Sequence, residues 1–210
     1  MDVPFLALEV MYSYNLTSTM HGLQWVSLAT QSVGVGRFGS IPMLARISLV
    51  DFRGNTILDT YVRPTTPVMN YRIEETGIGA HHLEQGIPFT EAKSLVAAAI
   101  SGKVVVGHSL WKDLYLLEMS VPAFATRDTA LFIPYRAVIN PNDLSSIIGL
   151  NTLVGFLMQR LISVHHQDSL ENARATMDLY RSAQDAWEGA IDDCEWPCAL
   201  PPPTFARCYT

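Results

Sequence analysis

Three segments rich in β-branched and aromatic residues follow one another near the start of the chain. They span residues 23–28, 43–50 and 56–62. A glycine-rich stretch separates the first two segments, and a turn through Gly54 and Asn55 separates the last two. Short β-prone runs with turns between them are typical of neighbouring antiparallel strands. This order predicts that the first third of the chain forms one sheet.

Helical and strand-like segments alternate after residue 63. The expected strands lie at residues 103–107 and 125–129, and the expected helices lie at 71–76, 90–100, 111–119, 144–161 and 169–188. Strands followed by such an alternation predict an α/β fold with a mixed central β-sheet flanked by helices. We expect an N-terminal extension over residues 1–22, one domain over 23–190 and a Pro-rich, irregular C-terminal tail over 191–210.

Composition narrows the classes of protein that fit. With 210 residues, of which 49% are hydrophobic, the chain can bury the core of a single domain. Fourteen Lys and Arg against twenty Asp and Glu give a net charge of −6, which excludes a polybasic nucleic-acid coat. No apolar run reaches the length of a membrane span, so we expect no membrane partner. All three cysteines follow residue 193, which favours an intracellular, reducing compartment.

Three segments hold the residues that point to chemistry. They are residues 27–36, 107–114 and 167–177, which a mixed sheet would bring together. With residues 44–50, 58–64, 127–129 and 173–180, they resemble the RNase T-like DEDDh 3′→5′ exonucleases, in the branch of ribosomal-RNA-processing and interferon-induced exonucleases. The resemblance covers about residues 25–188 and implies a ribonuclease H-like exonuclease fold.

The same resemblance implies a catalytic site in which four carboxylates hold two Mg²⁺ or Mn²⁺ ions and a histidine takes a proton from water. Where the family has Asp-x-Glu, this chain has Ala29 and Gln31 at the two acidic positions. The second-motif aspartate matches Asp113. The last aspartate falls on Asn172 and the histidine on Gln167. Asp113 is thus the sole retained carboxylate.

These substitutions lead to three expectations. The first is an exonuclease-like protein that has lost two-metal hydrolysis, takes no cofactor, and binds single-stranded RNA, single-stranded DNA or a protein partner. The second is an active 3′→5′ exonuclease on RNA or single-stranded DNA, with Mg²⁺ or Mn²⁺ in an unconventional site made by Asp113, His166 and Glu171. The third is a protein-interaction module. The resemblance implies a nuclear protein, and a cytoplasmic location is equally compatible.

Other side chains have both a functional and a structural interpretation. Four arginines would line a nucleic-acid groove or form structural ion pairs: Arg63, Arg72, Arg127 and Arg136. Three aromatic residues would stack on bases or pack in the core: Phe38, Trp111 and Tyr135. His108 follows a buried strand, and we expect it to be a structural histidine.

Overall fold

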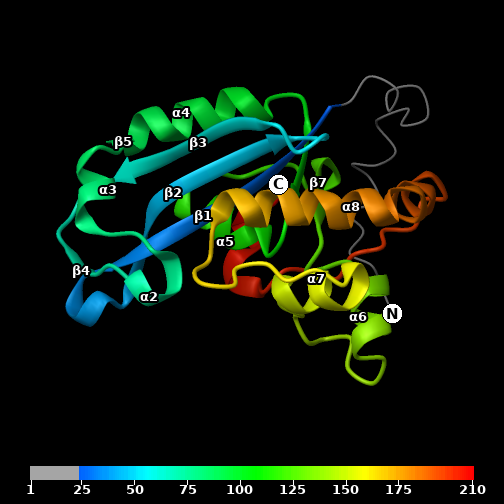
Figure 1. Cartoon of the computed structure of the whole chain (residues 1–210). Coiled ribbons are helices and arrows are strands. Elements are labelled where there is room, and N and C mark those ends of the chain that lie inside the picture. Colours follow the sequence, from blue (N-terminus) through cyan, green and yellow to red (C-terminus); the bar gives the residue numbers. More distant parts are fainter. Residues whose placement is uncertain (1–23) are drawn as a thin grey trace.

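A seven-stranded sheet with helices on both faces forms the body of the computed structural model, which describes residues 24–210 (Figure 1). The strands are β1 (Trp25–Val35), β2 (Ile41–Asp51), β3 (Thr56–Arg63), β4 (Val68–Asn70), β5 (Ile87–Pro88), β6 (Val104–Gly107) and β7 (Thr126–Asp128). Their order is β5-β3-β2-β1-β6-β7, with β4 paired to β1. The predicted mixed sheet is confirmed. The extension predicted over residues 1–22 lies outside the described residues.

Strand β1 is the centre of this sheet and is longer than the sequence predicts. It pairs antiparallel with β2, from Val26 opposite Asp51 to Val35 opposite Ile41, with a bulge after Gln31. It also pairs parallel with β6, and β6 pairs parallel with β7. The sequence predicts that Ala29 and Gln31 follow the strand. Because β1 continues to Val35, both residues lie within it.

Helices cover the two faces of the sheet. They are α2 (Ile73–Thr76), α3 (Ala80–Glu84), α4 (Phe89–Ile100), α5 (Leu110–Leu116), α6 (Ile133–Ile139), α7 (Leu150–Met158) and α8 (Ser169–Asp192), with 3₁₀ turns η3 (Arg37–Gly39), η4 (Ala123–Ala125) and η5 (Pro203–Cys208). Helices α4 and α5 pack on one face, and α8 packs on the other with α6 and α7. None of the helices in residues 24–210 is long and apolar enough to cross a bilayer.

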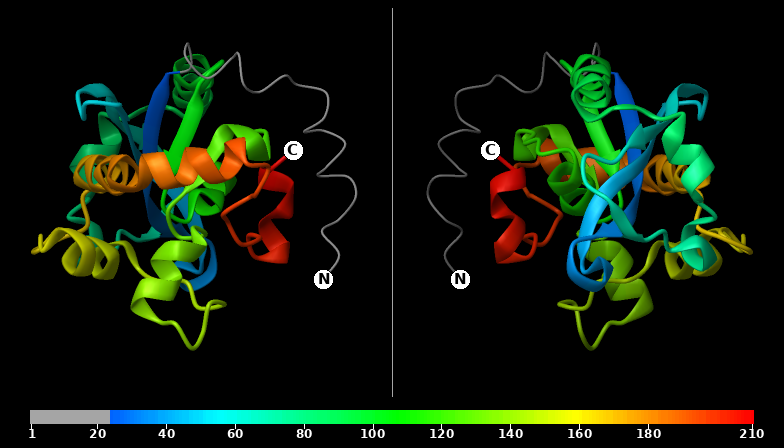
Figure 2. Two further views of the ribbon diagram at one scale, coloured as in Figure 1. Left: turned by 90° about the vertical axis from the view of Figure 1, so that its right-hand side faces the viewer. Right: turned by 90° about the vertical axis from the view of Figure 1, so that its left-hand side faces the viewer.

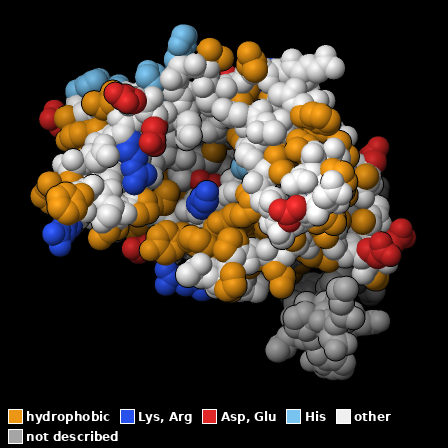
Figure 3. Space-filling model, turned by 90° about the horizontal axis from the view of Figure 1, so that it is seen from below, with side chains coloured by type: hydrophobic (Ala, Val, Ile, Leu, Met, Phe, Trp, Pro, Cys, Tyr) orange, Lys and Arg blue, Asp and Glu red, His pale blue; other side chains and the backbone are white. Residues whose placement is uncertain are grey.

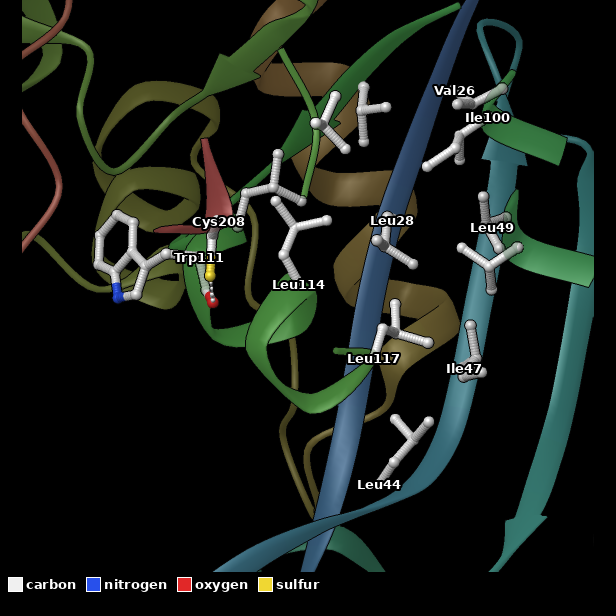
Figure 4. Close-up of a cluster of buried hydrophobic side chains, with 14 of the residues drawn as sticks. Val26, Leu28, Leu44, Ile47, Leu49, Ile100, Trp111, Leu114, Leu117 and Cys208 are labelled. Atoms are coloured by element: carbon white, nitrogen blue, oxygen red, sulfur yellow. Dashed lines mark hydrogen bonds between the residues drawn. The ribbon is translucent and has the colours of Figure 1, made fainter. Parts of the chain in front are cut away.

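Alternate residues along the strands supply the two layers of the core. Leu28 of β1 and Leu49 of β2 lie in the layer that α5 completes with Leu114 (Figure 4). Their neighbours Ala29 and Val50 pack in the α8 layer. This alternation follows from the period of two in a strand. It sends successive residues of β1 to α5 and to α8.

Two local features differ from the sequence-based expectations. Helix α6 was not predicted, because Pro134 lies in its first turn, where proline is tolerated but hides the helical pattern. Helix α4 begins at Phe89, and Pro88 takes the N-cap position expected for Thr90.

The C-terminal segment, predicted as a Pro-rich, irregular tail, packs on the domain. Figure 2 shows this red segment beside the green α5 region. Tyr209 forms a β-bridge with Val121, and Cys198 forms one with Phe132. Cys208 is buried, and its thiol donates to the Trp111 carbonyl. Helix α8 ends at Asp192, before the first proline of this segment at Pro197, and apolar side chains near the end of the chain pack against the core.

Candidate active site

Strand β1 presents its motif residues to two different helices. Thr30 faces α5, where its side chain bonds Asp113. Ala29 and Gln31 face the other way, toward the start of α8. The three segments meet at β1, but Ala29 and Gln31 lie on the α8 side of the strand, whereas Asp113 lies on the α5 side and contacts Thr30. Thr30 is also part of this site, although it was not among the predicted site residues, because the strand was expected to end at residue 28.

Asp113 is held by one of its two carboxylate oxygens. Its Oδ1 accepts hydrogen bonds from the Thr30 backbone N–H at 2.9 Å and from the Thr30 hydroxyl at 2.6 Å. Among residues 24–210, no donor reaches Oδ2. Only 8% of the residue is exposed. Burial raises the pKa of Asp113 to about 7, although the two bonds from Thr30 lower it.

A second buried carboxylate, Asp128 at the end of β7, fixes the start of α5. It accepts hydrogen bonds from the backbone N–H groups of Ser109 at 2.9 Å and Leu110 at 2.7 Å. Tyr209 donates to the same carboxylate at 3.3 Å. Burial raises the pKa of Asp128 to about 6. Asp128 thus sets the position of the helix that carries Asp113.

Gln31 is 4% exposed, and its carboxamide is fully used in hydrogen bonds. Its Nε2 donates to the carbonyls of Thr76 at 3.2 Å and Gln167 at 2.5 Å. Its Oε1 accepts from the Ser169 backbone N–H at 3.2 Å and from Arg46 Nη1 at 3.4 Å. The residue connects β1 to the end of α2 and to the start of α8.

Arg46 of β2 completes this cluster. Its guanidinium pairs with both oxygens of Asp59 at 2.9 Å and with Asp168 at 2.7 Å. Burial alone would lower the pKa of Arg46, but these carboxylates raise it above its usual range. Asp168 is also the N-cap of α8 and accepts from the Glu171 backbone N–H. Arg46 thus holds two carboxylates with one positive charge, and the cluster fixes the beginning of α8.

The remaining sequence-predicted positions lie near the start of α8. The Gln167 carbonyl accepts from Gln31, while its side chain is exposed. Asn172 Oδ1 accepts from the Ser163 hydroxyl at 3.3 Å. His166 Nδ1 lies 3.0 Å from the Glu74 carbonyl, and Glu171 accepts from the Ser163 backbone N–H at 2.8 Å. The structure thus engages His166 and Glu171 in contacts other than one with Asp113.

The residues at the family positions do not fit a pair of divalent cations. Asp113 supplies one carboxylate, Ala29 supplies no donor atom, and the Gln31 oxygen already accepts two hydrogen bonds. Within residues 24–210, no three His, Cys, Asp or Glu side chains form a group that could hold a metal ion. Hard cations need several oxygen ligands, preferably charged ones. The geometry therefore assigns no reaction step to such ions.

Most of the other candidate side chains are buried or paired within the fold, as their structural interpretation requires. Arg127 is buried and pairs with Glu188 at 2.7 Å. Arg136 donates to backbone carbonyls, including that of Ala130 at 2.8 Å. Trp111 and Tyr135 are buried in the core, whereas Phe38 is 83% exposed.

The remaining candidates include one histidine and two arginines. His108 contacts the Thr129 hydroxyl at 3.0 Å, and burial lowers its pKa to about 4, in keeping with a structural histidine. Of the other two arginines, Arg72 donates to Ser32 and Arg63 to the Glu84 carbonyl.

Several known nucleases are similar to this chain. Human apoptosis-enhancing nuclease is 33% identical over 175 residues, which are 82% of this chain and 54% of that protein. RNA exonuclease 4 of Kluyveromyces lactis is 36% identical over 159 residues, 76% of this chain and 53% of that protein. The chain spans about half the length of the curated relatives it matches. No family model matches it.

A solved structure supports the fold. The Saccharomyces cerevisiae Pan2 pseudoubiquitin hydrolase-RNA exonuclease module, in complex with A7 RNA, superposes with a TM-score of 0.67 at 24% identity. The match covers 81% of this chain and 30% of that one. The expected ribonuclease H-like exonuclease fold is confirmed.

The comparisons contradict one expectation. The sequence predicts a protein that has lost hydrolysis and acts by binding, because four of the five family positions have changed. The relatives are named nucleases and exonucleases, which favours the alternative of an active exonuclease. The number of carboxylates retained at the motif positions therefore did not predict the activity that the relatives' names indicate. The chain belongs to the DEDDh-type 3′→5′ exonuclease family.

Proposed function

We propose that this protein is a 3′→5′ exonuclease that shortens single-stranded RNA, with Asp113 as the group that takes a proton from the attacking water. Relatives named RNA exonuclease 4 support the reaction class. The Pan2 module, solved with RNA, supports the substrate class.

The state of the Asp113 carboxylate carries the proposal. A general base needs a fixed position, a free lone pair and a pKa near the working pH. Thr30 fixes Oδ1 through two hydrogen bonds, and Oδ2 has no partner within residues 24–210. Burial places the pKa of Asp113 at about 7. The carboxylate can therefore accept a proton near neutral pH.

The proposed step balances without a further reactant. The water oxygen forms a bond to the phosphorus of the last phosphodiester while one of its protons passes to Asp113 Oδ2. The bond between that phosphorus and the 3′ oxygen of the preceding nucleotide breaks, that oxygen takes a proton from bulk water, and Asp113 then releases its proton to bulk water. The products are a nucleoside 5′-monophosphate and an RNA shortened by one nucleotide.

One face of the molecule has the kinds of side chain that bind single-stranded RNA. Figure 3 shows hydrophobic side chains over much of the face seen from below, with Lys and Arg side chains between them. The exposed apolar residues include Phe38, Phe156 and Leu161. Single-stranded nucleic acids bind by stacking bases on apolar and aromatic side chains and by placing phosphates near cations.

The test is a time course with a 5′-labelled single-stranded RNA, run with Mg²⁺, with Mn²⁺ and with EDTA. We expect a ladder of labelled products that shorten from the 3′ end. Asp113→Asn should lower the rate by about 10²–10⁴-fold. As a control, Asp185→Asn makes the same chemical change at an exposed aspartate on α8 and should leave the rate unchanged. Absence of shortening in every buffer, or equal rates for wild type and Asp113→Asn, would overturn the proposal.

A further inference from the structure

The Gln31 side chain is buried and makes four hydrogen bonds, two as a donor and two as an acceptor. Its partners determine which end of the amide is which. The carbonyls of Thr76 and Gln167 can only accept, so they require the NH₂ group. The Ser169 backbone N–H and the Arg46 guanidinium can only donate, so they require the oxygen. One orientation of one carboxamide satisfies all four partners.

A carboxylate cannot replace this amide. Glutamate has the same length, but both of its terminal atoms are acceptors when it is ionised. One of its oxygens would face the Thr76 and Gln167 carbonyl oxygens with no hydrogen between them. Arg46 could not offset the new charge, because its guanidinium already pairs with Asp59 and Asp168. Three carboxylates would then share one cation, and the new one would be buried.

We infer that Gln31 is an amide clamp, by which we mean that its carboxamide joins β1 to the end of α2 and to the start of α8. It holds these three segments together without a divalent ion. The three segments that it connects are distant in the sequence, since Thr76 and Gln167 lie 45 and 136 residues from Gln31. The position where the family motif has glutamate therefore has a different function in this chain. It is a donor to carbonyls, and the acidic residue is incompatible with the partners that surround it.

The test is the thermal unfolding of the full chain without RNA, so its result does not depend on the proposed hydrolysis. Gln31→Glu should lower Tm by about 10 °C at pH 8, because it loses two donated hydrogen bonds and adds a buried charge. In a domain of this size, the loss of one hydrogen bond lowers Tm by roughly 2–4 °C. Gln85→Glu adds the same charge at an exposed position and should change Tm by about 1 °C or less.

Two readouts separate the clamp from a general packing role. A protonated glutamic acid regains one donor, so the Tm loss of Gln31→Glu should shrink as the pH falls toward 4. Manganese should not restore its Tm, and EDTA should leave the wild-type Tm unchanged. If Gln31→Glu does not fold at pH 8, Gln31→Met, which removes the four bonds without adding charge, should show a smaller loss that does not vary with pH. Wild-type stability of Gln31→Glu at pH 8, recovery of its Tm with Mn²⁺, or a pH-dependent loss in Gln31→Met would overturn the inference.

Discussion

Replacing Asp113 with asparagine should stabilise the protein, and the gain should grow with pH. Asparagine keeps an oxygen to accept the two hydrogen bonds from Thr30. Its NH₂ group takes the place of Oδ2, which has no partner among residues 24–210. The variant therefore preserves the local contacts and removes one ionisation. The difference between the two proteins isolates the cost of charging a buried carboxyl group.

The sign and the size of this cost follow from the pKa. Burial raises the pKa of Asp113 from 3.8 to about 7 in the folded protein. A carboxyl group with a raised folded pKa favours folding below the unfolded pKa, and this stability is lost as the pH rises through the folded pKa. The wild type should therefore lose about 1.4 kcal/mol per pH unit between pH 4 and 7, relative to Asp113→Asn. The difference should be about 1.5 kcal/mol at pH 5 and about 4 kcal/mol at pH 8.

The assay is urea denaturation of both proteins at pH 4 to 8, followed by circular dichroism. Other groups titrate in both proteins and largely cancel in the difference, whereas Asp128 contributes to it, because its charge raises the pKa of Asp113. Parallel stability curves from pH 4 to 8 would refute the reasoning, because they would show that Asp113 is charged at the same pH in the folded and unfolded chain. A variant less stable than wild type at pH 8 would do the same.

Three other substitutions test individual contacts. Thr30→Val removes the hydroxyl that bonds Asp113 at 2.6 Å, so the pKa of Asp113 should rise by about one unit in a carboxyl NMR titration. An unchanged titration midpoint would exclude this contact. Arg46→Lys loses the two-point pairing with Asp59 and should lower the free energy of unfolding by about 2 kcal/mol in urea, whereas Arg53→Lys on the exposed turn should have no effect. Trp187→Ala removes a fully buried ring stacked 3.9 Å from Phe132 and should cost about 3–5 kcal/mol, and a loss below 1 kcal/mol would contradict this packing.

The sequence predicts the regular parts of this fold because their patterns are local. The start of α8 at Ser169 follows from the spacing of Leu170, Ala173 and Met177, and the structure begins the helix there. The β2 and β3 strands follow from β-branched residues and the turn at Gly54, which has the positive φ of 86° that glycine tolerates.

The site was only partly predictable because its contacts are not local. Arg46 meets Asp59 and Asp168, which lie 13 and 122 residues away, and nothing in the residues around Arg46 indicates either partner. Thr30 lay between two family positions, but its bond to Asp113 depends on β1 continuing beyond residue 28. The strand period, extended through the motif, would have placed Thr30 on the α5 side. The prediction of lost hydrolysis depended on a count of missing metal ligands, and the relatives named nucleases contradict it.

The pH dependence of RNA shortening tests the central role of Asp113 most directly. Single-turnover rates of 3′-end removal should be measured for the wild type and for Asp113→Asn from pH 5.5 to 8.5. Because the carboxylate must be ionised to accept a proton, the wild-type rate should rise through a midpoint near pH 7, where the pKa of Asp113 lies, and then level off. A wild-type rate that is independent of pH, or an Asp113→Asn rate that follows the same curve, would contradict the account.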